Sequence, residues 1–374
     1  MMSWKIPSLE HPPKPALPHF LLWLGLVVII SVLGFGLGLY LSSKEILPST
    51  MNNNQIITFF VVFPVMILIC IRLLAYSIAA YRHQLFTNML DDAHREWRYW
   101  AGKHLGMLTH TRLTHIDEAQ QEGNSLSSLP PNKENILTLN SLVSLPSWEK
   151  PVKIIQQLLE PIAAYTQKNT LTQPITLYWS SNDYDTDWTA LLKHEAARLS
   201  LALESIAILP YKSFEEWLLA LYENPFEPKL YAILAFQLDS TASQEASSLL
   251  LAPQGFYERL RAPLQAKLLR PISTDRESFA DALKAQCEFQ LKGEQLTSIW
   301  HSNISDSNKM ECIQNYIQQN IRCLSEHFYD ADTLLGISNL ARYGVVLSLA
   351  SESLQPVLVT HQNGDRLLLQ QLLI

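Results

Sequence analysis

Two long apolar runs, separated by a short polar stretch, limit what this chain can fold into. The first run, residues 20–41, and the second, residues 56–71, contain no charged residue. At about 1.5 Å per helical residue, the first can cross a hydrocarbon layer ~30 Å thick. The second becomes long enough if the helix continues past Arg72 and that side chain reaches toward the lipid headgroups. The intervening Pro48 and the asparagines after it predict a turn. We therefore predict a transmembrane helical hairpin over residues 20–80, in preference to a buried core helix or a cleaved signal peptide.

The basic residues predict how the hairpin is oriented. Between the runs there is one of them, Lys44, whereas several flank the hairpin on both sides. Because Lys and Arg stay on the cytoplasmic side of a membrane, we expect a two-pass protein with both termini cytoplasmic. The flanking basic residues are Lys5, Lys14, Arg72, Arg82, Arg95, Arg98 and Lys103.

Two sets of residues are candidates for contacts in and at the membrane. Gly34 and Gly38 have the small-x-x-x-small spacing that lets helices pack closely, although glycine is also common in membrane helices generally. Residues 81–116 read as a juxtamembrane helix. It either lies against anionic headgroups or is a stalk whose apolar stripe packs on the rest of the protein. The membrane-interface candidates on it are Arg82, Arg95, Trp97, Arg98 and Trp100.

The remaining chain divides by composition. Residues 1–19 are proline-rich and predict a poorly ordered tail, and residues 117–150 are rich in Ser, Asn, Pro and Glu and predict a linker. Residues 151–374 alternate apolar strand patterns with amphipathic helix patterns, which is typical of an α/β domain. Each half of that domain ends in two adjacent strands, at 230–238 with 245–252 and at 356–360 with 366–373. We predict a duplicated, cytosolic α/β unit.

Sequence motifs for catalysis or cofactor binding are few. The net charge of −7 argues against nucleic-acid binding, and the four cysteines form no CxxC pair. Phosphate-binding glycine loops and HExxH are absent. The spacing Asp183-x-Asp185-x-Asp187 resembles a calcium loop but lacks its glycine and final glutamate, so we interpret it as a helix-capping loop. His327 and His361 are single histidines without a paired nucleophile. We predict no catalytic, cofactor or metal residues.

Two segments carry a resemblance to thiolases and ketoacyl synthases. Residues 330–360 (DADTLLGISNLARYGVVLSLASESLQPVLVT) resemble the C-terminal helix–strand unit of that family, and residues 230–252 resemble its strand hairpin. The resemblance implies a thiolase-like fold. It does not extend to the chemistry, because no cysteine lies between Ile71 and Gln286 and no histidine lies near residues 332–336. A thiolase-like fold that lacks these catalytic residues is suited to a binding function.

The layout of a membrane segment before such a body is also similar to the lipase-adaptor family of bacterial type VI secretion, with the stretches EASSLLLAP and LLRPIST. That resemblance implies a non-enzymatic, inner-membrane adaptor or accessory protein with lipid, secretion-system proteins or a lipase effector as partners. Homo-oligomerisation stays open. The alternative is a membrane-bound acyl-transfer or lipid-modifying enzyme that uses Ser338 or His327. In a third hypothesis the hairpin itself is the binding surface within a secretion membrane complex.

Overall fold

The protein consists of two compact units. One is a hairpin unit, Pro7–Glu96, and the other is a body made of Met1–Ile6 and Trp97–Ile374. The computed structural model describes residues 4–6, 13–16, 19–44, 46, 48, 51–121, 130–183, 185–291, 296–321, 327–352 and 356–373.

The hairpin unit is built from two long helical segments. The first is α1 (Phe20–Ser43); the second runs through α2 (Asn53–Ile57), the π-helical turn η1 (Thr58–Val62) and α3 (Phe63–Ala101), whose last residues belong to the body. The Asn52 backbone N–H donates to Gln55 Oε1 (3.0 Å), which caps the second segment where the predicted turn ends. Both segments are long and apolar enough to cross a membrane by length and composition. The side of a membrane on which the termini lie stays a prediction.

Gly34 and Gly38 lie where the two helices of the hairpin approach each other. A Cβ added at Gly34 would be 1.9 Å from the carbonyl oxygen of Phe60, and one added at Gly38 would be 2.8 Å from a methyl carbon of Ile56. A Cβ at Gly36 would have no atom within 4 Å. The helices can approach this closely at Gly34 and Gly38 only because both residues are glycine. A larger residue at either position would separate the helices locally.

This geometry gives a prediction with an internal control. Gly34→Leu should force the helices apart, whereas Gly36→Leu should leave them in place. Cysteines introduced at Trp23 and Arg72 would report the difference through a bifunctional thiol cross-linker, because the Arg72 guanidinium lies 5.4 Å from the Trp23 ring centroid. In a background without other thiols, we expect cross-linking to be at least fivefold slower with Gly34→Leu. Equal rates in the two leucine variants would contradict packing through Gly34.

The body is organised around one mixed sheet in the order β3-β2-β4-β5-β1-β6-β11-β10-β8-β9, with β7 pairing on β11. Pairs β2/β3, β2/β4, β8/β9 and β8/β10 are parallel, and the other pairs are antiparallel. The strands are β1 (His104–Leu113), β2 (Ile175–Ser181), β3 (Leu203–Ile208), β4 (Leu230–Gln237), β5 (Glu245–Pro253), β6 (Ala266–Leu269), β7 (Ile272–Thr274), β8 (Ser298–Ser302), β9 (Phe328–Asp330), β10 (Val357–Asn363) and β11 (Arg366–Leu373).

The sheet order is the same in both halves of the body. The strands of the first half lie in the order β3-β2-β4-β5-β1, and those of the second half lie in the order β9-β8-β10-β11-β6. Strands at the same place in the two orders pair with their neighbours in the same relative direction, parallel or antiparallel. The two halves meet where β1 pairs with β6. The predicted duplication is therefore confirmed.

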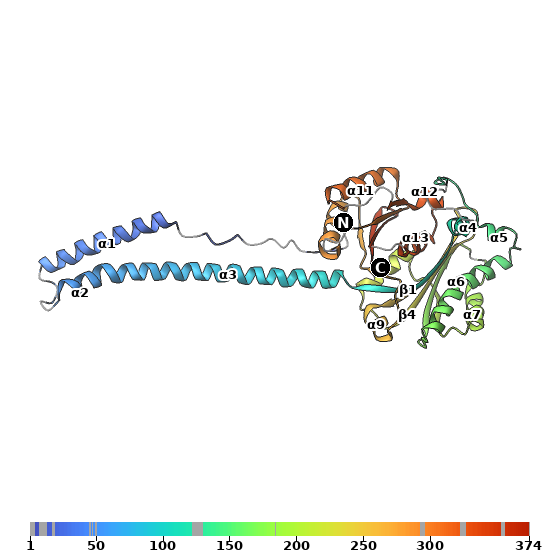
Figure 1. The fold of residues 1–374 in the computed structure, drawn as a ribbon, viewed down its shortest axis with the longest axis horizontal. Helices are drawn as coiled ribbons and strands as arrows, with labels where there is room; N and C mark the ends of the chain where they lie inside the picture. The colour runs from blue at the N-terminus through green and yellow to red at the C-terminus, as the bar shows by residue number, and fades with distance from the viewer. Residues whose placement is uncertain are drawn as a thin grey trace. The chain divides into compact units, whose positions relative to one another are not determined.

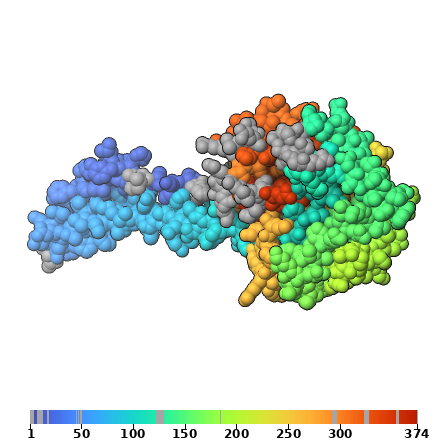
Figure 2. Space-filling view, turned by 45° about the vertical axis from the view of Figure 1, so that its right-hand side comes forward, coloured from blue at the N-terminus to red at the C-terminus, as the bar shows by residue number. Residues whose placement is uncertain are grey.

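Helices cover both outer faces of the sheet and fill the space between its halves (Figure 1). Helices α6 and α7 pack on the outer face of the first half, and α10, η3 and α11 pack on that of the second. Helices α8 and α13 share one apolar core with inward-facing residues of both halves. Figure 2 shows the green surface of the first half and the orange surface of the second on different sides of the body. The helix bounds are α4 (His115–Gln121), α5 (Asn140–Val143), α6 (Glu149–Lys168), α7 (Trp188–Arg198), α8 (Phe214–Glu223), α9 (Gln254–Leu260), α10 (Phe279–Gln286), η3 (Cys287–Leu291), α11 (Asp306–Gln318), α12 (Ala331–Leu335) and α13 (Arg342–Ser351).

The body begins earlier in the chain than the sequence predicts. The predicted helix over residues 81–116 ends at Ala101, and strand β1 follows it in the middle of the sheet, hydrogen-bonded to β5 and β6. The predicted linker 117–150 contributes the buried side chains of Leu139 and Leu142 to the core of the first half. Residues 331–351 contain two helices, α12 and α13, and Gly336 adopts φ +74° between them.

The N-terminal tail is held at one position. Trp4 is only 3% exposed, and its indole N–H donates to the carbonyl oxygen of Pro271 (3.0 Å). Its ring meets Trp100 edge-on, with centroids 5.2 Å apart. Residues 4–6 therefore belong to the body, in contrast to a poorly ordered tail, and residues 7–12, 17 and 18 lie outside the described residues.

Candidate functional site

The membrane-interface candidates separate into two groups. Trp97 and Trp100 are partly buried and pack against the apolar cluster of α10 and α11. Arg82, Arg95 and Arg98 are exposed along α3. Their contact with a membrane stays a prediction.

Ser338, His327 and Asp187, the candidate residues near turns, lie at separate places in the body. Ser338 lies half-buried between α12 and α13 and has no hydrogen bond to a titratable base within the described residues; His327 is exposed just before β9. The Asp187 carboxylate accepts a hydrogen bond from the Ala190 N–H (3.0 Å), which caps α7 as the sequence predicts. Among the residues that the structure describes, no group of three or more His, Cys, Asp or Glu is placed to hold a metal ion.

A buried chain of three polar side chains joins the two halves of the body. Ser302 ends β8, and His361 lies beside it on β10 as its register partner. The Ser302 hydroxyl is 3.0 Å from His361 Nδ1, and His361 Nε2 is 3.0 Å from Glu215 Oε1, in the first turn of α8. The exposed fractions of Ser302, His361 and Glu215 are 0%, 4% and 7%. A hydroxyl, an imidazole and a carboxylate are thus linked in the order that nucleophilic catalysis uses.

Electrostatics fix the roles of the three groups. Burial opposes ionisation of Glu215, but the hydrogen bond and the charge of His361, together with Ser213, outweigh it and lower the pKa of Glu215. The carboxylate is therefore ionised and accepts a hydrogen bond from His361 Nε2. In the tautomer that carries its proton on Nε2, His361 Nδ1 is left as an acceptor for the Ser302 hydroxyl. In this tautomer His361 can take the proton of Ser302 as a general base.

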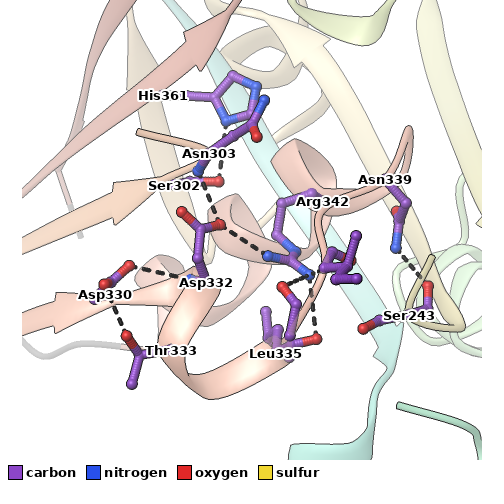
Figure 3. A network of polar contacts seen from close by, with 12 residues as sticks. Ser243, Ser302, Asn303, Asp330, Asp332, Thr333, Leu335, Asn339, Arg342 and His361 are labelled. Carbon is purple, nitrogen blue, oxygen red and sulfur yellow. Dashed lines mark hydrogen bonds and ion pairs between the residues drawn. The ribbon is translucent and has the colours of Figure 1, made fainter. Parts of the chain in front are cut away.

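A second polar network adjoins the first (Figure 3). The N–H of Asn303, the residue after Ser302, donates to Asp332 Oδ1 (2.9 Å), and that oxygen also accepts from Arg342 Nη1 (3.0 Å). Arg342 is fully buried, donates to Glu245 at 2.6 Å, and reaches the carbonyl oxygens of residues 335–337. This network fixes the connection between α12 and α13 next to Ser302.

The body contains another buried serine–histidine contact that differs in one respect. Ser348 Oγ is 2.6 Å from His110 Nδ1, and burial lowers the pKa of His110 to about 4. The described residues place no carboxylate in hydrogen-bond contact with that imidazole. The pair therefore has a base and a hydroxyl but lacks the orienting carboxylate that Glu215 provides.

Sequence reasoning noted His361 only as a single histidine without a paired nucleophile, and it missed both partners. Ser302 lies 59 residues before it, and Glu215 lies 146 residues before it. Only the parallel register of β8 with β10, and the return of α8 to the centre of the body, bring the three together. Ser213 caps the start of α8, and nothing in the local sequence indicates that Glu215 faces a histidine.

Comparisons with known proteins found structural matches only. No family model matches the chain, and no curated protein matches it. Similar solved structures include a type II polyketide synthase ketosynthase with its acyl-carrier protein, AntDE:AntF (10% identity, 72% of this chain and 99% of that chain, TM-score 0.49). The oxazolomycin ketosynthase domain of OzmH from Streptomyces albus follows (10%, 72% and 95%, 0.48). OleA from Xanthomonas campestris bound with cerulenin is a third (8%, 74% and 99%, 0.48).

The fold is mixed α/β with a duplicated sheet order, and it resembles the thiolase-like folds of these ketosynthases and OleA. The prediction of a non-enzymatic adaptor finds no support, because none of the three matched structures concerns a type VI secretion system. Membership in the lipase-adaptor family finds no support. The alternative prediction, an enzyme with a thiolase-like fold, stays a prediction, and its predicted residues Ser338 and His327 are not part of the buried chain described above.

Proposed function

We propose that this protein is a membrane-bound acyl-transfer enzyme that uses Ser302 as its nucleophile. The observation that supports the proposal is the continuous hydrogen-bonded chain from Ser302 through His361 to Glu215. The two apolar helical segments support attachment to a membrane. The substrate class that fits this chemistry is a carboxylic ester or thioester.

The proposed reaction has two balanced halves. In the first, Ser302 Oγ adds to the acyl carbonyl carbon while His361 Nδ1 takes the hydroxyl proton; collapse of the adduct expels the alcohol or thiol, which receives that proton. In the second, water or an acceptor alcohol attacks the acyl-serine, and His361 again moves the proton. The Glu215 carboxylate stabilises the imidazolium that forms in each half.

The site as described is closed. Because Ser302 is 0% exposed, an acyl group reaches its oxygen only after the neighbouring side chains move apart. A closed site would also exclude water from the acyl-serine until an acceptor binds. We therefore expect transfer or hydrolysis to be slow in the free protein.

The experiment is acylation of the full-length protein in detergent micelles with nitrophenyl esters and acyl thioesters of increasing chain length. Mass spectrometry would locate the acyl group, and product release would be followed by absorbance. We expect Ser302→Ala to reduce the rate at least a hundredfold, because removal of a nucleophile leaves only binding and positioning effects.

Ser348→Ala is the matched control, because it removes an equally buried hydroxyl that also contacts a histidine. We expect this variant to keep the wild-type rate. Glu215→Gln should keep the fold and lower the rate, since a neutral amide cannot stabilise the imidazolium. Equal activity of Ser302→Ala and wild type, or acylation at Ser348 instead, would refute the assignment.

A further inference from the structure

A cavity of about 320 Å³ lies where β2 and β4 begin and α8 ends. Its floor is formed by the parallel pair β2/β4, in which Thr176 and Tyr231 are register partners. One wall is the last turn of α8 with the loop that follows it, and the loop after β3 closes the other side. The volume is at the lower end of the range typical of ligand sites, ~300–1,000 Å³.

Aromatic rings line this cavity. The Trp217 ring is 5.9 Å from that of Tyr178 and 5.7 Å from that of Tyr231, and the planes are inclined at 56° and 70°. Trp217 and Tyr231 are only 4% and 5% exposed, whereas Tyr211 at the rim is 45% exposed. Rings at these distances pack directly on one another, so together they present a continuous aromatic surface to the cavity.

The polar ends of these rings are unsatisfied. The Trp217 indole N–H and the Tyr178 and Tyr231 hydroxyls have no hydrogen-bond partner within the described part of the chain, and none of the three is among its fully buried unpaired atoms. They are therefore open to the cavity. Burial raises the pKa of Tyr231 to about 12, so its hydroxyl is protonated and can donate. Three donors thus face a space where a ligand's acceptors would sit.

Three charged residues lie at or beside the rim: Glu227 and Lys229 line the cavity, and Glu204 contacts Lys229 from next to it. Lys229 lies between two carboxylates, with its amine 3.3 Å from Glu204 and 3.2 Å from Glu227. One ammonium group therefore neutralises only one of two carboxylates. A ligand that places a cation at this rim would be favoured.

We propose that this cavity binds a proline-rich, basic segment of a partner protein in the polyproline II conformation. Proline rings pack on aromatic surfaces, and the backbone carbonyls of such a segment, which make no internal hydrogen bonds, accept from tryptophan and tyrosine donors. A lysine or arginine of the segment meets the surplus carboxylate. A quaternary ammonium ligand would satisfy the rings and the charge but would leave the three donors unpaired. The proposal is independent of the acyl-transfer function.

The test is fluorescence anisotropy with the full-length protein in detergent micelles. The probe is a labelled nine-residue peptide of eight prolines and one central lysine, and its partner has glutamate in place of lysine. We expect saturable binding of the lysine peptide and at least fivefold weaker binding of the glutamate peptide. Choline is the competitor that tests the ammonium alternative, and displacement by choline would overturn the proposal.

Two conservative variants locate the site. Trp217→Phe and Tyr231→Phe keep a ring and remove one donor each, so each should weaken the lysine peptide at least fivefold. Circular dichroism would verify folding, and the tyrosine variant decides the question if the tryptophan variant is unstable. Trp148→Phe changes a tryptophan that is 73% exposed elsewhere and should bind as wild type. Absence of saturable binding, or unchanged binding in both cavity variants, would refute the proposal.

Discussion

Arg342→Met is expected to lower the free energy of unfolding of the body by about 3–5 kcal/mol, the cost typical of removing one partner from a buried ion pair. The Arg342 guanidinium is 0% exposed and donates to Glu245 and Asp332, and the side chain of Glu245 is itself only 2% exposed. Without Arg342, the carboxylate of Glu245 is buried with no countercharge. The carbonyl oxygens of Leu335 and Gly336 lose the Arg342 donor as well, whereas that of Ile337 keeps the N–H of Ser243.

Thermal and denaturant unfolding of the full-length protein would measure this loss. At roughly 2–4 °C per kcal/mol for a domain of this size, we expect the midpoint to fall by at least ~6 °C. Arg276→Met is the control, because the ion pair of Arg276 with Glu311 is exposed and should contribute less than ~1 kcal/mol. The double variant Arg342→Met, Glu245→Gln should recover part of the loss. A stable single variant would mean that the network does not support the α12–α13 connection.

Acidification is expected to destabilise the body through His301. Burial lowers the pKa of His301 to about 3, so the folded protein holds this imidazole neutral while the unfolded chain binds a proton near pH 6.5. The stabilisation is therefore present in full above pH 6.5 and is lost as the pH falls toward about 3, by ~1.4 kcal/mol per pH unit. Between pH 7 and pH 5 this histidine alone should cost about 2 kcal/mol.

Denaturant titrations at pH 7 and pH 5 test this expectation. His301→Gln should remove this part of the pH dependence, because glutamine has no proton to gain and its amide can replace the 3.0 Å contact of His301 Nε2 with the Tyr316 hydroxyl. His194→Gln changes an exposed histidine on α7 and should leave the slope as in wild type. A slope that persists in His301→Gln would assign the effect to another group, of which His110, also buried, is the first to examine.

The sequence predicted the parts of the fold whose signals are local. The continuous apolar run of β4, its antiparallel partner β5 and the β10–β11 hairpin lie where the residue pattern placed them. Strand β1 was missed because its sequence, HLGMLTHTRL, directly follows a long helix, and its strand conformation comes from β5 and β6 pairing on both sides. No local pattern records that pairing.

The candidate site was less accessible to sequence reasoning than the fold. The sequence pattern of β10 is the same whether its histidine, His361, is a core residue or a general base. What distinguishes His361 is a hydroxyl on a neighbouring strand and a carboxylate on a helix of the other half. The duplication of the fold was predictable from repeated strand pairs. The meeting of residues from both halves at one point depends on how the halves pack, and no repeat in the sequence specifies it.

The burial of Trp4 sets an order of events during biosynthesis. Its acceptor, Pro271, is made 267 residues later, and its docking cluster includes residues of β11 at the end of the chain. The apolar segments 20–41 and 56–71 therefore leave the ribosome, and can insert, while the N-terminal residues are still undocked. Once Trp4 docks, one folded body holds both ends of the intervening segment. A chain closed in this way can cross a bilayer only an even number of times.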